Sequence, residues 1–172
     1  MNKKSSKFWA FMQSLGRTFM LPVALLAAMG ILLGIGSGLS GATTVEMFPF
    51  LGNSIIQAIL GFMVSVSLVA FSFLPLLFAI AIPLGMAKDN KEIAAFAGVV
   101  GFIAMHLGTN FYLNNTGLIE TVSTQTIMGI ESIDTGVLGA LASGVLVYKI
   151  HEKFQYTKLP DSFAFFGGTR FV

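Results

Sequence analysis

The sequence predicts an all-α, polytopic integral membrane protein with about four transmembrane helices. Apolar residues make up 55% of the 172-residue chain and charged residues only 10%, whereas a typical soluble domain carries about 25% charged residues. Long uncharged stretches recur along the chain, and short charged segments separate them. A chain of this composition cannot cover itself with polar surface, so the lipid bilayer is the expected solvent.

The composition also excludes several classes of function. The chain has no cysteine, which rules out disulfides, thiolate metal sites and cysteine nucleophiles. Two histidines are too few for a zinc site, and a net charge of +2 is too small to indicate nucleic acid. No paired carboxylates, nucleophile elbow or metal cluster can be recognised. We therefore expect no cofactor, no metal and no catalytic residue in this chain.

Residues 1–17 are predicted to be a cytoplasmic or interfacial segment. Three lysines precede Trp9 closely, and basic residues beside an aromatic anchor suit a helix in the headgroup layer. A plain flanking segment is the alternative. Apolar side chains recur at the helical spacings of four, three and four residues, at Phe8, Met12, Leu15 and Phe19.

The first transmembrane helix is predicted over residues 18–38. This stretch carries no charge, and its length of about 21 residues is enough to cross a hydrocarbon core of about 30 Å. Three glycines recur every four residues, which would let another helix approach closely. These predicted helix-packing residues are Gly30, Gly34 and Gly38.

The second span is predicted within residues 57–87, a stretch without any charged residue. One straight helix of this length would measure about 46 Å, which exceeds one bilayer crossing. Pro75 and Pro83 are predicted to kink or break the helix. We expect one steeply bent or two-part span, and a tilted helix with a projecting end is the alternative.

The third span is predicted over residues 93–113, after the charged turn KDNKE at 88–92. It contains His106, and an ionisable residue at membrane depth indicates function by default. His106 is therefore a weak candidate for substrate binding. A neutral histidine bonded to a neighbouring helix is the favoured alternative.

The fourth span is predicted over residues 133–150, after the polar stretch 114–132. Asp134 suits a helix start, because its carboxylate can cap free backbone N–H groups. Residues 151–172 are expected to form a cytoplasmic segment. The small residues predicted to pack in this span are Gly136, Gly139 and Gly144.

The basic residues predict the orientation of the chain. All ten lysines and arginines lie in residues 1–17, 88–92 and 149–172, whereas the predicted outer loops 39–56 and 114–132 have none. Cytoplasmic loops of membrane proteins carry an excess of such residues. We therefore expect both termini in the cytoplasm.

Four stretches resemble one family of transporters. They are GRTFMLPVALLAAMGILLGIGSG (16–38), FSFLPLLFAIAIPLGMAKDNKEIAAFAGVVGF (71–102), SIDTGVLGALASGVLVYKIHEKF (132–154) and KLPDSFAFFGGTRFV (158–172). The chain is similar to enzyme IIC, the membrane component of the bacterial phosphoenolpyruvate-dependent sugar phosphotransferase system. Within the glucose/glucoside superfamily, the maltose- and glucose-type permeases look most similar.

The resemblance implies a function and a set of partners. Members of the family are homodimers in the bacterial cytoplasmic (inner) membrane that bind a sugar outside and carry it inward. A phosphorylated IIB domain or subunit then phosphorylates the sugar. The family as a whole is a protein-N(pi)-phosphohistidine–sugar phosphotransferase, whereas no phosphorylated or catalytic residue of the family can be matched to this chain.

The resemblance also implies which part of the permease the chain contains. In the family, the stretch similar to FFGGTRFV at 165–172 is followed by further spans that carry the sugar-binding residues. Residues 1–172 are therefore expected to be the N-terminal scaffold and dimer-interface part, without the substrate site. A membrane scaffold or regulator that does not transport, and that pairs with a full-length permease, is the alternative hypothesis.

Overall fold

The computed structural model describes residues 3–171, with side chains placed for residues 8–169. Helices make up most of the described residues, and the only strands among them form one short hairpin. The predicted all-α class is confirmed. The chain divides into two compact units, one of residues 20–74 and one that combines the segment before Met20 with the residues from Pro75 onward.

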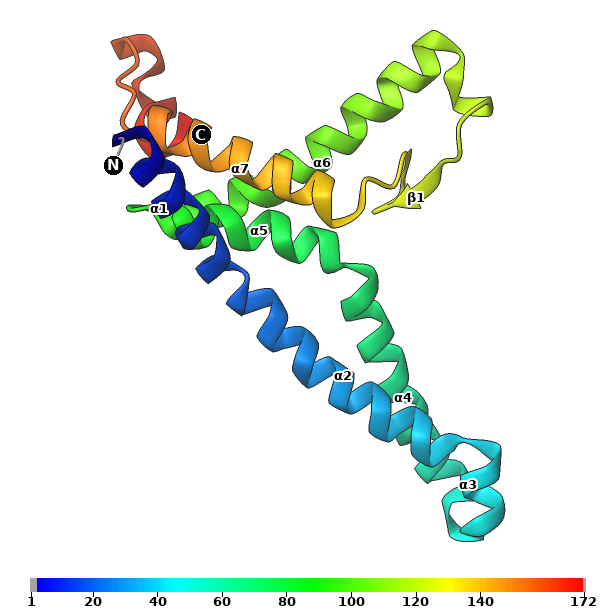
Figure 1. Cartoon of the computed structure of the whole chain (residues 1–172). Coiled ribbons are helices and arrows are strands. Elements are labelled where there is room, and N and C mark those ends of the chain that lie inside the picture. The colour runs from blue at the N-terminus through cyan, green and yellow to red at the C-terminus, as the bar shows by residue number, and fades with distance from the viewer. Residues whose placement is uncertain (1–2, 172) are drawn as a thin grey trace. The chain divides into compact units, whose positions relative to one another are not determined.

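The unit of residues 20–74 is a helical hairpin. Its helices α2 and α4 pack side by side (Figure 1). They come into close contact at Gly36, where an added Cβ would lie 3.0 Å from the carbonyl oxygen of Leu60. Its elements are α2 (Met20–Ser40), α3 (Ala42–Met47), the 3₁₀ helix η1 (Pro49–Gly52) and α4 (Ser54–Ser72).

The start of α4 is set by local hydrogen bonds. The Oδ1 atom of Asn53 accepts a hydrogen bond of 2.9 Å from the backbone N–H of Ile55, which satisfies one of the free donors at the helix start. The side-chain amide of Gln57 donates to the carbonyl of Leu51 at 2.9 Å. These bonds tie the connecting segment to the first turn of α4.

The other unit contains four longer helices and a hairpin. Its helices are α1 (Lys3–Thr18), α5 (Leu74–Met86), α6 (Lys91–Thr116) and α7 (Gly136–Phe154). Strands β1 (Gln125–Ile127) and β2 (Ile130–Ser132) pair antiparallel, with Thr126 opposite Glu131. Three short 3₁₀ helices complete the unit, at η2 (Leu118–Glu120), η3 (Asp161–Phe166) and η4 (Gly168–Phe171).

Helix α5 is the buried centre of this unit. Ala79 and Ile82 have no exposed surface. A Cβ added at Gly98 of α6 would lie 2.6 Å from the carbonyl oxygen of Ala79, and one added at Gly144 of α7 would lie 3.0 Å from the Cβ of Ile82. Helices α6 and α7 therefore both approach α5 closely because they present glycine at the contact.

The expected span over 57–87 consists of two helices. Helix α4 ends at Ser72 and α5 begins at Leu74. Pro75 explains the break, because proline has no N–H to donate and disfavours helical geometry in the residue before it. Pro83, by contrast, lies inside α5 without ending it.

Three helical segments are long and apolar enough to cross a membrane, among the residues that the structure describes. They are 8–40, 54–72 and 91–116. Helix α5 is apolar but has only 13 residues, and α7 occupies the region of the expected fourth span. The count of four crossings thus remains a prediction, whereas the helical membrane architecture is confirmed.

Candidate functional site

Two clusters of hydrogen-bonded polar side chains lie in the unit that combines the segment before Met20 with the residues from Pro75 onward, which is called the second unit below. One surrounds His106 near the hairpin. The other joins the turn between α5 and α6 to the end of α7 and continues into the C-terminal loop. The sequence analysis singled out only the first of them.

His106 is buried in α6, with 2% of its surface exposed. Its Nδ1 atom lies 2.9 Å from the hydroxyl oxygen of Ser132 on β2, and its ring packs edge-on against Phe102 with centroids 4.6 Å apart. One turn later, the amide of Asn110 donates to the carbonyl of Glu131 at 2.8 Å. His106 therefore connects α6 to the hairpin, and its Nε2 atom has no hydrogen-bond partner among the described residues.

The second cluster is a junction, defined here as Lys88, Asp89 and Asn90 together with the end of α7. His151 is fully buried, and its Nε2 atom lies 3.0 Å from the carbonyl oxygen of Asp89. A carbonyl can only accept, so Nε2 carries the hydrogen in this arrangement. The Nδ1 atom of His151 is buried and has no hydrogen-bond partner in the part of the chain that the structure describes.

Three further hydrogen bonds close this junction. The backbone N–H of Lys88 donates to Glu152 at 3.1 Å, and the amide of Asn90 donates to Gln155 at 3.0 Å. The hydroxyl of Tyr156 donates to the carboxylate of Asp89 at 3.0 Å. The last turn of α7 and the two residues after it thus bind each of the three turn residues, although the partners are more than 60 residues apart in sequence.

The same contact alters the acidity of Tyr156. Its hydrogen bond to the Asp89 carboxylate is the main cause of a raised pKa, because the bond stabilises the neutral phenol. Desolvation and the negative charges of Asp89 and Glu152 act in the same direction. Tyr156 therefore acts as a hydrogen-bond donor in the junction rather than as a base.

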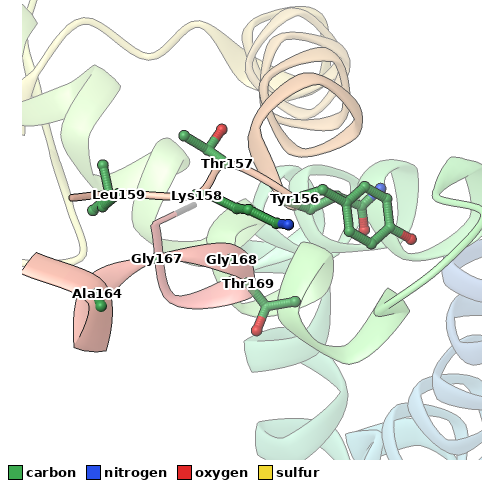
Figure 2. A pocket seen from close by; sticks show the side chains of 9 residues that line it. Tyr156, Thr157, Lys158, Leu159, Ala164, Gly167, Gly168 and Thr169 are labelled. Carbon is green, nitrogen blue, oxygen red and sulfur yellow. The ribbon is translucent and has the colours of Figure 1, made fainter. Parts of the chain in front are cut away.

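A pocket of about 500 Å³ lies beside the junction (Figure 2). The loop that forms it is closed by a hydrogen bond of 2.8 Å from the backbone N–H of Gly168 to the carbonyl of Thr157. Gly168 has φ +67°, a conformation that favours glycine. The lining residues are Gln155, Tyr156, Thr157, Lys158, Leu159, Ala164, Gly167, Gly168 and Thr169.

Few polar side chains line the pocket in the part of the chain that the structure describes. Lys158 is the one charged side chain among these described lining residues, and Thr157 and Thr169 contribute hydroxyl groups. The described residues contain no group of three or more histidine, cysteine or acidic side chains that could hold a metal ion.

The predicted packing glycines divide into those that meet another helix and those that do not. Gly144 meets Ile82 of α5, whereas a Cβ at Gly139 would meet Thr135 of its own helix start. Gly136 has φ +55° and lies in open space. Open space also surrounds the three glycines of the α2 stripe, which are Gly30, Gly34 and Gly38.

Other glycines make the close contacts that the spacing pattern did not reveal. Gly98 meets α5, Gly36 meets α4, and Gly101 faces Val147 of α7. A Cβ at Gly85 would meet Thr18 of α1. A regular four-residue spacing is therefore a poor guide to contacts within this chain, because each contact uses one isolated glycine.

Comparison with known proteins identifies the family. The family model described as "Phosphotransferase system, EIIC" matches residues 16–172. The chain belongs to the EIIC family of the phosphotransferase system. The resemblance inferred from the sequence motifs is confirmed, and so is the membrane localisation that the hydropathy predicted.

Two curated relatives illustrate the similarity. The chain is 52% identical to the PTS system maltose-specific EIICB component of Escherichia coli (strain K12), over 95% of this chain and 32% of that protein. It is 32% identical to the PTS system glucose-specific EIICBA component of Staphylococcus saprophyticus subsp. saprophyticus, over 96% of this chain and 25% of that protein. The chain thus spans a third or less of the length of these relatives.

Proposed function

We propose that this chain provides the N-terminal scaffold of a maltose- or glucose-type sugar permease, whose uptake is coupled to phosphorylation of the sugar by a IIB partner. The observation that carries the proposal is the match of the EIIC family model to residues 16–172. The 52% identity to a maltose-specific component favours maltose among the possible sugars.

The packing of the chain supports a scaffold role. Helix α5 is enclosed by α6 and α7 through the glycine contacts at Gly98 and Gly144, and tight packing of this kind gives a rigid body. The described residues offer no converging set of polar side chains of the sort that selects a sugar. We therefore assign the sugar contacts and the phosphoryl acceptor to partner segments or domains outside residues 1–172.

A chimera tests this function. Residues 1–172 would replace the matching N-terminal part of the E. coli maltose-specific EIICB component, in a strain that lacks its own maltose- and glucose-type permeases. We expect phosphoenolpyruvate-dependent uptake and phosphorylation of labelled maltose to be restored. A chimera that inserts into the membrane in normal amount but transports no maltose would refute the proposal.

The same chimera can be built on the glucose-specific relative to examine sugar preference. If this chain is a scaffold, each chimera will keep the sugar of its C-terminal part. If the transported sugar follows residues 1–172 instead, the assignment of the sugar contacts to other segments is wrong.

We further propose that two copies associate through the open glycine face of α2. Gly30, Gly34 and Gly38 lie in open space within the chain, and a small-residue stripe permits close helix approach in lipid. Because the chain has no cysteine, Gly34→Cys introduces a single cross-linking site. We expect a disulfide-linked dimer in membranes.

A matched variant makes the cross-linking specific. Gly108 of α6 also lies in open space, so Gly108→Cys tests random collision in the membrane. Equal dimer yields from Gly34→Cys and Gly108→Cys would contradict an α2 interface. Capture of a longer permease by Gly34→Cys, without a dimer of this chain, would favour the alternative of a non-transporting scaffold or regulator.

A further inference from the structure

The segment before α2 exceeds the length that one membrane crossing needs. The apolar helical stretch 8–40 contains 33 residues, which corresponds to about 50 Å of helix against a hydrocarbon core of about 30 Å. Helix α2 alone, with 21 residues, fills that core. Helix α1 ends at Thr18, two residues before α2 begins, so residues 8–19 are not needed for the crossing.

The described side chains of α1 divide into a packed and an exposed set. Thr18 is buried, and Phe11, Met12 and Leu15 are partly buried. Phe8 and Trp9, in contrast, are 63% and 65% exposed. Aromatic side chains of this kind are favoured at the boundary between headgroups and hydrocarbon, where their rings contact both environments.

The charge of this segment has one sign only. Residues 1–45 contain no aspartate or glutamate. The first acidic residue along the chain is Glu46, which lies beyond the end of α2. The basic residues of the segment are Lys3, Lys4, Lys7 and Arg17.

We propose that α1 is a membrane-surface anchor that binds anionic phospholipid. Phe8 and Trp9 insert at the headgroup boundary, and the positive charge of the segment attracts it to anionic lipid. Apolar burial and electrostatic attraction together determine the binding of such helices. The occupant of this exposed surface is the lipid, because a segment with four cations and no anion matches a negatively charged leaflet.

The chain contains its own probe for this proposal. Trp9 is the single tryptophan among the 172 residues, so tryptophan fluorescence reports on α1 alone. The 172-residue chain would be reconstituted into vesicles of phosphatidylcholine, with or without about one third phosphatidylglycerol. Phosphatidylcholine with brominated acyl chains then quenches Trp9 if the ring lies at the boundary.

We expect strong quenching of Trp9 in the phosphatidylglycerol vesicles and much weaker quenching in pure phosphatidylcholine. The variant Lys3→Gln, Lys4→Gln, Lys7→Gln should lose the dependence on anionic lipid. A basic residue near an anionic surface contributes roughly a fivefold change in the binding equilibrium, so three should contribute about a hundredfold. The matched control Lys88→Gln, Lys91→Gln, Lys149→Gln removes the same charge elsewhere and should behave as the unchanged protein.

Three results would overturn the proposal. Trp9 could be quenched by aqueous acrylamide but not by brominated lipid, which would place it in water. It could resist both quenchers, which would place it against protein. Finally, quenching by brominated lipid that is equal with and without phosphatidylglycerol would show that apolar contact alone holds α1, without any role for lipid charge. The comparison of lipids uses the unchanged protein, so it does not depend on the folding of any variant.

Discussion

Replacement of Gly98 by alanine tests the packing that makes α5 the centre of the second unit. The added Cβ would lie 2.6 Å from the carbonyl oxygen of Ala79 and 2.9 Å from Cγ of Pro83, whereas ordinary contact begins at 3.4 Å. The overlap with a backbone atom is thus about 0.8 Å. Backbone atoms cannot rotate away, so α5 and α6 must separate, and overpacking of this kind costs about 1–3 kcal/mol.

Gly108→Ala provides the matched control on the same helix. Gly108 has no atom within 4 Å of an added Cβ, so its substitution keeps the helix-propensity gain of about 1 kcal/mol without the clash. The two variants therefore share the gain and differ by the steric cost. We expect the free energy of unfolding of Gly98→Ala to be about 1–3 kcal/mol below that of Gly108→Ala.

The assay is unfolding of the purified chain in mixed micelles by increasing fractions of dodecyl sulfate, followed by helical circular dichroism. Equal free energies of unfolding for the two variants, with both proteins folded at the start, would refute the close approach of α5 and α6. A larger loss for Gly98→Val than for Gly98→Ala would further support it, because valine adds more volume at the same contact.

The junction at the α5–α6 turn leads to two further predictions. His151→Ala should lower the free energy of unfolding by about 1–3 kcal/mol, because it removes the part-buried hydrogen bond to the Asp89 carbonyl and leaves empty space where the buried imidazole lay. His151→Gln should recover part of the loss, since the glutamine amide can replace the Nε2 donor. Equal free energies of unfolding for His151→Ala and His151→Gln would show that the hydrogen bond to Asp89 does not stabilise the fold. For Tyr156, absorbance titration compared with Tyr156→Phe should give a pKa above the ordinary value of about 10, and Asp89→Asn should lower it. Because the pKa is raised on folding, the stabilising bond is present below about pH 10 and is lost as pH rises through the higher folded pKa.

Hydropathy and charge predicted the class of the fold well, because both properties depend on whole segments. The stretch 18–38 corresponds closely to α2, and the break near Pro75 follows from the chemistry of proline alone. The hairpin at 125–132 was not predicted. Its strands have three residues each, which is too short for an alternating pattern to be recognised.

The contacts of individual residues could not be predicted from spacing. His106 was singled out as a polar residue in a predicted span, but its partner Ser132 lies 26 residues further along the chain. His151 was not considered, since it follows the predicted span in a segment rich in charge. Its burial depends on the turn at 88–90, which only the folded chain brings to it. Such pairings depend on tertiary structure, which local sequence does not encode.

The short length of α5 has a consequence for how the protein responds to its membrane. At 13 residues, α5 measures about 20 Å and cannot match the thickness of a bilayer. Part of its apolar surface is instead enclosed by protein, with Phe78, Ala81 and Ile82 all buried. A thicker or thinner bilayer will tilt or strain the apolar helices that are long enough to cross it. The buried part of α5 is shielded from this mismatch by protein, so the contacts around Ala79 and Ile82 can keep their geometry in membranes of different thickness.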